Sequence, residues 1–566
     1  MENQTKQKNK KSLLKSGLVL SLMTFASRIM GLIREMTKAS FLGTSMFADA
    51  FSTAFQIPNL LRRLFAENAI SVAFIPTFKD YLERQNAGTL AANANSQDGS
   101  LNQGTKKETQ DFLNATFTLV TFLTACVVVI GILITPLLMP LFCKKPVDTQ
   151  ALNYLEQLDF WLQKKQVITL LTRIMFPYLC VISIAAFFQG ILNGCKIFAP
   201  SGFTPVLFNG TVIAATYIFG SRSNDPAVAA KAMSIGVVAG GCIQALFQLP
   251  FVLKTGWKVS FTSLAKTFKN PGTRKVVSLI VPTIIGMAAY QLNDLVSTSM
   301  AMRTGEGIAS SLQYSLRLQE LILGIFAVSI GTVILPDLSG LASREEWDEF
   351  NKMLITAIKI IIVITIPVTF YSIVQGRELI CLLYQNKMFD EESVLLTLGE
   401  FRFHIAGLFF IAANRIISPA FYAQGNTKLP TLAGIISFAS NILLVLILSR
   451  PMSGNGIALA LSVASFINTV FLFIFMKKMN SFDVKSVLKS TIIYILKITV
   501  LSVIAAVPCY FLRPILLNVF AGHGRLISQG MPVAVSAVIF AIIGVGLLVI
   551  TKDPIVGVVV KKIKRK

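Results

Sequence analysis

Residues 58–76, PNLLRRLFAENAISVAFIP, place charged side chains inside a run that otherwise has the composition of a membrane-spanning helix. Arg62, Arg63 and Glu67 interrupt this apolar run. Ionisable groups are costly in hydrocarbon, so those that occur there usually face a bundle interior or a water-filled cavity. Guanidinium groups form paired hydrogen bonds with phosphates and remain charged when partly desolvated. The segment therefore predicts an anion-binding function within a membrane.

Other predicted spans also carry charged residues, namely Arg28, Arg34, Asp49, Arg317, Glu320, Arg402, His404 and Arg415. The arginines among the candidate cavity residues outnumber the carboxylates Asp49, Glu67 and Glu320. The cavity is therefore expected to be net cationic and its cargo to be an anion such as a diphosphate.

Each charged group also has a structural interpretation. Arg63 and Glu67 are spaced i, i+4, and Arg317 and Glu320 are spaced i, i+3, so each pair is able to neutralise itself on one helix. For these four residues the structural reading weighs as much as the functional one. Arg62 lies about 100° around the helix from Arg63 and needs another counter-charge.

Arg28 and Arg34 have only Glu35 as an acidic neighbour, and Glu35 directly follows Arg34 and is not expected to share its face. The two arginines are about 120° apart on a regular helix, so they line a broad cavity or the helix bends. Snorkelling to the membrane surface suits Arg34 and Lys38 at the outer end of the span, and suits the deeper Arg28 less well.

The composition requires membrane-spanning elements to position these groups. Of the 566 residues, 54% are hydrophobic and 14% are charged, and apolar runs recur along the whole chain without strand-like alternation. This predicts an all-α polytopic membrane protein. Hydropathy predicts fourteen spans, at 17–37, 47–78, 112–142, 168–194, 203–221, 228–253, 277–302, 313–340, 353–375, 398–424, 430–449, 455–477, 488–512 and 529–551.

The distribution of charge predicts the orientation. Lys and Arg are concentrated in the leader, in the loop 254–275 and in the C-terminal tail, which places both termini in the cytoplasm. These basic groups match no recognised nucleic-acid-binding motif, so contact with anionic membrane lipids is favoured over nucleic acid, which we do not expect as a partner. The polar stretch 86–110 is expected to be a flexible cytoplasmic loop.

Faint internal repetition predicts the domain organisation. AISVAFIPTF at 69–78 resembles SIGTVILPDL at 329–338, six predicted helices later, and a second pair of segments has the same offset. An even offset preserves orientation, so two parallel six-helix lobes are expected. The predicted divisions are 1–254 for the first lobe, 255–480 for the second, and 481–566 for two additional helices and the basic tail.

The sequence lacks nucleotide-binding, zinc-protease and serine-hydrolase motifs, and its cysteines lack metal-ligand spacing. We therefore expect no enzyme activity, no catalytic residue, no cofactor and no metal site. His404 is interpreted as a core histidine rather than a proton switch. Asp294 and Asn441 are weak candidates for a coupling-cation site.

The motifs resemble those of one family. SRIMGLIRE at 27–35, ADAF at 48–51 and PNLLRRLFAE at 58–67 are similar to segments of the MurJ (MviN) family of bacterial lipid II flippases, within the multidrug/oligosaccharidyl-lipid/polysaccharide exporter superfamily. LRLQELILGIFAVSIGTVILPDLS at 316–339 also resembles the family's eighth helix. Two positions depart from the family pattern. Asn68 replaces a usual glycine, which puts the hinge there in doubt, and Gln56 replaces a frequent lysine, which removes a cationic contact.

The resemblance implies that the protein transfers lipid II, an undecaprenyl-diphosphate-linked disaccharide peptide, across the bacterial cytoplasmic (inner) membrane during peptidoglycan biosynthesis. It implies alternating access around a cationic central cavity, with the polyprenyl tail in a groove beside the last two helices and a coupling cation or the membrane potential supplying energy. It also implies that Arg28, Arg34, Arg62 and Arg317 are functional cavity arginines, that Asp49 is a sensitive carboxylate, and that Arg415 replaces another cationic cavity residue.

Three alternatives stay open at the level of sequence. An exporter of drugs or of another polyprenyl-linked saccharide belongs to the same superfamily, although a drug-cation exporter would need an acidic cavity. A membrane enzyme acting on polyprenyl-phosphate sugars would need catalytic carboxylates or metal ligands, for which Asp49 alone is thin support. A scaffold of the cell-wall machinery would not need the cavity arginines.

Overall fold

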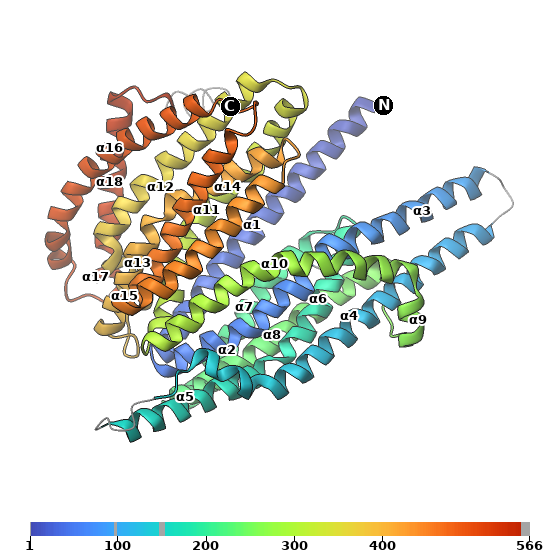
Figure 1. Cartoon of the computed structure of the whole chain (residues 1–566), viewed down its shortest axis with the longest axis horizontal. Coiled ribbons are helices and arrows are strands. Elements are labelled where there is room, and N and C mark those ends of the chain that lie inside the picture. The colour runs from blue at the N-terminus through green and yellow to red at the C-terminus, as the bar shows by residue number, and fades with distance from the viewer. Residues whose placement is uncertain (1, 69, 95–98, 147–152, 556–566) are drawn as a thin grey trace. The chain divides into compact units, whose positions relative to one another are not determined.

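The computed structural model describes residues 2–68, 70–94, 99–146 and 153–555, and every regular element in these ranges is helical (Figure 1). Within these ranges the side chains of 2–21, 66–68, 88–94, 99–103, 282, 285–286, 288–290 and 325–335 are not described. Nine helical stretches of the described residues are long and apolar enough to cross a membrane. The chain is therefore an all-α polytopic membrane protein, as the composition predicted.

The chain forms two compact units, and the boundary between them lies between Ser299 and Met300, within helix α10. The N-terminal unit (residues 1–299) contains α1 Glu2–Leu42, α2 Met46–Arg62, η1 Arg63–Asn68, η2 Ile70–Phe74, α3 Ile75–Ala94, α4 Gly99–Phe142, α5 Tyr154–Met175, α6 Pro177–Gly194, α7 Ala199–Phe219, η3 Gly220–Arg222, α8 Pro226–Lys254, α9 Leu264–Lys269 and most of α10 Pro271–Thr304. The C-terminal unit (residues 300–566) contains the end of α10, α11 Ile308–Ser343, α12 Trp347–Tyr384, α13 Glu391–Ala406, α14 Leu408–Tyr422, α15 Lys428–Met476, α16 Val484–Val519, α17 Arg525–Ser528 and α18 Gly530–Ile550.

Each of the fourteen predicted spans lies mainly on helical backbone in the described residues, with turns at Phe176 and Gly407 inside two of them. The spans 430–449 and 455–477 both fall within α15, which turns at Ser453, where φ is 52°. Pro451 precedes this turn, and a side chain on Gly456 would collide with the Leu448 carbonyl, so the close return of the chain requires glycine. The exact number of membrane crossings and the three-part domain division stay predictions.

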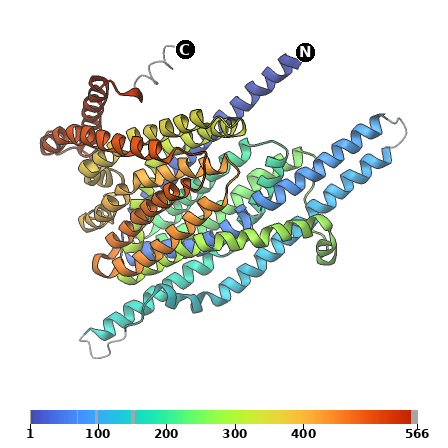
Figure 2. The same ribbon diagram turned by 45° about the horizontal axis from the view of Figure 1, so that its top comes forward.

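The flexible loop expected at 86–110 is wrong for the described part of that stretch. Helix α3 continues to Ala94 and helix α4 begins at Gly99. The stretch contains several helix-favouring residues, among them Ala and Gln, and no proline that would interrupt a helix, although Asn, Gly, Ser and Thr are also frequent in it. Figure 1 and Figure 2 both show α3 and α4 side by side, and the two helices are in contact.

Helix α2 passes into two π-helical segments where the motif residues lie. The wider η1 begins at Arg63 and η2 ends at Phe74, and Pro58 lies one turn before them. A π-helical segment changes the register of side chains around the helix axis and is frequent at functional sites. The distortion therefore accompanies the charged segment even though Asn68 replaces the family's usual glycine.

In the C-terminal unit, α12 packs against α16 and α18, which lie beside each other in both views (Figures 1 and 2). Tyr371 of α12 donates a hydrogen bond to the Val533 carbonyl of α18 at 2.7 Å. Arg513 of α16 forms an ion pair with Glu378 of α12 at 2.6 Å. Polar contacts thus hold the last two long helices to α12.

Candidate anion-binding site

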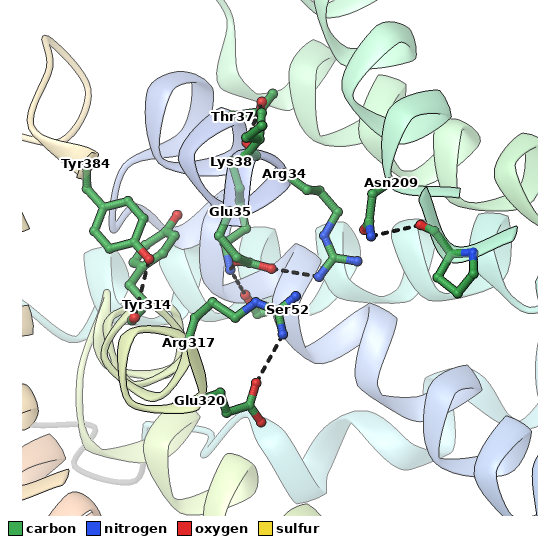
Figure 3. Close-up of polar contacts among 12 residues, drawn as sticks. Arg34, Glu35, Thr37, Lys38, Ser52, Asn209, Tyr314, Arg317, Glu320 and Tyr384 are labelled. Carbon is green, nitrogen blue, oxygen red and sulfur yellow. Dashed lines mark hydrogen bonds and ion pairs between the residues drawn. The ribbon is translucent and has the colours of Figure 1, made fainter. Parts of the chain in front are cut away.

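A buried ionic cluster connects α1 with α2 in the N-terminal unit (Figure 3). Arg34 Nη2 lies 2.8 Å from Glu35 Oε1, and Lys38 Nζ lies 2.8 Å from Glu35 Oε2. Lys38 also donates a hydrogen bond to Ser52 Oγ of α2 at 3.3 Å. One carboxylate of α1 is therefore shared by two cations, and one of these cations reaches the second helix.

Arg34 and Glu35 form an ion pair although, as expected, adjacent residues do not share a helix face. The two side chains meet because an arginine is long enough to fold around the helix surface to its neighbour, although the Cα–Cβ directions diverge. The i, i+3 spacing of Glu35 and Lys38 was the sequence signal for the second pair.

The snorkelling interpretation of Lys38 is wrong in the same region. Its side chain is 2% exposed, and it interacts electrostatically with Asp49 of α2, which is fully buried. A buried cation is stable only with counter-charges and hydrogen bonds, which Glu35, Asp49 and Ser52 supply. Lys38 therefore belongs to the interior of the unit.

Arg34 lies at the edge of this cluster rather than beneath it. Its side chain is 17% exposed, and its guanidinium carbon lies 5.6 Å from the centre of the Phe55 ring. The ring and Glu35 orient the guanidinium group by a cation–π contact and an ion pair. Arg28, two turns earlier on α1, is half-buried.

Arg62 and Arg63 are held differently by their surroundings. Arg62 Nε donates a hydrogen bond to Asn59 Oδ1 at 2.9 Å, one turn earlier on α2. Arg63 Nη1 lies 3.5 Å from Asp294 Oδ2 of α10, and Gln56 donates a hydrogen bond to the Asp294 carbonyl at 3.1 Å. Asp294, a candidate cation ligand in the sequence, thus lies against an arginine.

The interaction expected between Arg63 and Glu67 lies outside the described residues, because the Glu67 side chain is not described. The contact between Arg63 and Asp294 joins residues that are far apart in the chain. Local spacing provided no signal for it.

In the C-terminal unit, Arg317 Nη1 forms the intrahelical ion pair with Glu320 Oε2 at 3.0 Å (Figure 3). The two side chains are 29% and 49% exposed, so the pair is accessible to a competing anion. Arg415 on α14 is also exposed, as is Arg402 on α13. The expectation that the predicted site residues of the whole chain bind one head group stays a prediction.

His404 lies in a separate buried polar group of the C-terminal unit. Its Nδ1 is 2.6 Å from Ser315 Oγ, and its carbonyl accepts a hydrogen bond from Gln319. Nearby on α13, the fully buried Glu400 accepts a hydrogen bond from Ser311 at 2.9 Å. The environment of His404 is that of a hydrogen-bonded core histidine.

No cluster of three or more His, Cys, Asp or Glu side chains suited to a metal ion occurs in the part of the chain that the structure describes. Asn441, the second candidate cation ligand, is buried on α15. That the arginines described above bind an anion stays a prediction.

Over most of its length the chain is similar to proteins of one family. The family model described as "Lipid II flippase MurJ" matches residues 38–523, which include α2, α11 and α14. The chain belongs to the MurJ family. A probable lipid II flippase MurJ of Treponema pallidum is 45% identical over 546 residues, which cover 96% of this chain and 97% of that protein. The probable lipid II flippase MurJ of Vibrio cholerae is 32% identical and covers 82% of each chain.

Solved structures of two transporters share the fold of this chain. A lipid II flippase MurJ in an inward closed conformation has a TM-score of 0.71 at 24% identity, covering 95% of this chain and 100% of that one. An inward-facing multidrug resistance MATE transporter of the MOP superfamily has a TM-score of 0.51 at 13% identity, covering 81% and 99%.

Proposed function

We propose that this MurJ-family protein moves lipid II from the cytoplasmic to the periplasmic leaflet of a bacterial inner membrane. The observation that carries the proposal is a set of partly accessible arginines on membrane helices, each already held by a polar group of the protein itself. Arg34 is held by Glu35, Arg62 by Asn59 and Arg317 by Glu320. Such groups are oriented, charged and open to exchange.

The proposed recognition step is an exchange of anions. In the empty protein, Glu35 neutralises Arg34, which lowers the cost of keeping a guanidinium group inside the membrane. The diphosphate of lipid II then competes for Arg34 and Arg62 and forms paired, charge-assisted hydrogen bonds with them. Release outside returns the arginines to their internal partners.

Transfer of the lipid II head group across the membrane needs a protein that shields the head group from hydrocarbon. Moving the diphosphate and sugar-peptide head through hydrocarbon would remove water from its charges, whereas the polyprenyl tail is soluble in lipid. Alternating access carries the head past the arginines while the tail stays in the bilayer. The membrane potential supplies about 2.3 kcal/mol per charge per 100 mV, and a coupling cation is the other proposed energy source.

The decisive experiment is complementation in bacterial cells depleted of their own flippase, with a readout of externally exposed lipid II. At matched membrane levels, wild type should restore growth and exposure, and Arg62→Ala should reduce exposure at least about tenfold, since it removes a charge-assisted phosphate contact worth about 1.5–3 kcal/mol.

Arg450→Ala is the matched control, because Arg450 is an exposed arginine on α15 outside the candidate site. It should behave as wild type. Full activity of Arg62→Ala would remove the anion-binding mechanism, and failure of wild type to restore exposure would remove lipid II as the substrate.

A further inference from the structure

Lys38 holds a position that the diphosphate-binding proposal leaves without a role. Its side chain is almost completely buried, so it is not among the groups that we propose to contact the substrate. Its ammonium group reaches Glu35 of α1 and Ser52 of α2 (Figure 3), and Asp49 lies within electrostatic range. A lysine buried at this cost is expected to act on its neighbours.

The geometry divides the charge of Glu35 between two cations. Oε1 lies 2.8 Å from Arg34 and Oε2 lies 2.8 Å from Lys38. Lys38 attracts the carboxylate and repels the Arg34 guanidinium, so both effects weaken the hold of Glu35 on Arg34. The same positive charge offsets the buried Asp49 and keeps the local potential from becoming negative.

We propose that Lys38 is a positioning residue that keeps Arg34 exchangeable, so that Arg34 can leave Glu35 for a diphosphate. The inference rests on the proposed function and adds to it the means by which the internal anion is prevented from outcompeting the substrate. Through Ser52, Lys38 also fixes Glu35 relative to α2, the helix that carries Arg62.

This role predicts the direction in which diphosphate affinity changes in each variant, which a purely structural role does not. Lys38→Met leaves Glu35 free to bind Arg34 without a competitor and leaves Asp49 less neutralised, so diphosphate binding weakens. Adding Glu35→Gln removes the internal anion and restores the balance of charge, so binding recovers. Glu35→Gln alone frees Arg34 and makes the site more positive, so binding strengthens.

The experiment measures binding of a short-chain polyprenyl diphosphate to purified full-length protein in nanodiscs, together with the thermal unfolding of each variant. We expect Lys38→Met to raise Kd about tenfold, equivalent to about 1.4 kcal/mol. The double variant Glu35→Gln/Lys38→Met should return to within about threefold of wild type, and Glu35→Gln alone should lower Kd. Lys164→Met, which removes another buried lysine of the same unit, should leave Kd unchanged.

Ser52→Ala provides a milder test if Lys38→Met does not fold, because it removes only the hydrogen bond from Lys38 to α2 and should raise Kd about two- to threefold. Wild-type affinity in both Lys38→Met and Ser52→Ala, or a double variant as weak as Lys38→Met, would overturn the role of Lys38 and leave the flippase proposal standing. If wild type itself does not bind the diphosphate, the proposed function fails and this inference fails with it.

Discussion

The charged residues of this protein illustrate how guanidinium groups can be kept within membrane helices. Three of them have internal partners in the structure: Arg34 pairs with the Glu35 carboxylate, Arg62 donates a hydrogen bond to the Asn59 amide oxygen, and Arg317 pairs with the half-exposed Glu320 carboxylate. A full, dry ion pair would bind the arginine too strongly to release it, and an unpartnered arginine would destabilise the helix. Partly exposed arginines with internal partners are consistent with the proposed binding and release of an anion.

Asp553, just beyond α18, is a charged residue with a structural role rather than a proposed binding role. Its side chain is fully buried and accepts hydrogen bonds from Lys497 at 2.6 Å and from Tyr494 at 2.8 Å. Burial acts to raise the pKa of Asp553, but these hydrogen bonds outweigh it and hold the pKa below its ordinary value. Because the pKa is lower in the folded state, the ionised group stabilises the fold above its ordinary pKa of about 3.9.

We therefore predict that acid removes this stabilisation. As pH falls below about 4 and through the folded-state pKa, the contribution of Asp553 is lost. Thermal unfolding of purified protein should show Asp553→Asn less stable than wild type at pH 7, with the difference shrinking on acidification. A difference independent of pH down to complete protonation would show that the carboxylate charge is not what stabilises this end of the chain.

Among the helices, α12 packs against α16 in an interface that contains one fully buried charged residue, Glu378. Glu378 is fully buried, and Arg513 places both Nε and Nη2 within 2.8 Å and 2.6 Å of its Oε1. Tyr371 lies two turns earlier on the same face of α12 and contacts α18. The two contacts fix both C-terminal helices to one stripe of α12.

Breaking the pair on one side should destabilise this interface strongly. Arg513→Leu leaves the Glu378 carboxylate buried without its arginine, and losses of about 3–5 kcal/mol are typical for such a change. We expect Arg513→Leu to lower the unfolding temperature in detergent by several degrees, whereas Glu378→Gln/Arg513→Leu should recover most of the loss. Equal destabilisation by the single and double variants would contradict an electrostatic cause.

The charged segment after α2 lies on irregular helical backbone. Pro58 and the π-helical turns from Arg63 onward place the motif on irregular helix, where side-chain directions do not follow the 3.6-residue period. A helical wheel therefore places Arg62 relative to Arg63 only approximately. Arg63, the first residue of the π-helical segment, contacts Asp294 of α10, whereas Arg62 contacts Asn59 of its own helix.

For the molecule as a whole, the distribution of Lys and Arg along the chain, rather than the net charge of +24, predicts the orientation in the membrane. The proposed topology has both termini in the cytoplasm, the segment 513–528 outside and the segment 477–483 inside. His523 lies in the first of these segments and Lys477 in the second, and both are exposed. The two positions report opposite faces of the membrane.

This topology predicts a labelling pattern in intact cells. In a variant without the seven native cysteines, His523→Cys should react with a membrane-impermeant maleimide, and Lys477→Cys should react only after the cells are permeabilised. Neither substitution changes a predicted site residue. Reaction of Lys477→Cys in intact cells would reverse the orientation and therefore the proposed direction of transport.

The all-α membrane class and the approximate positions of most helices follow from the sequence alone, because long apolar runs must become helices in lipid. Arginines within such runs need polar partners or water, but the anion-binding role of these arginines stays a prediction. The Arg317–Glu320 pair followed from i, i+3 spacing in the same way.

Only the tertiary structure decided how those charges are shared. The burial of Lys38 against Ser52 and Asp49 depends on how α1 packs on α2, and the contact of Arg63 with Asp294 joins helices far apart in the chain. Spacing along one helix shows which side chains are able to meet on that helix. It contains no information about which counter-charge a neighbouring helix brings, because that depends on packing between helices that the local pattern does not encode.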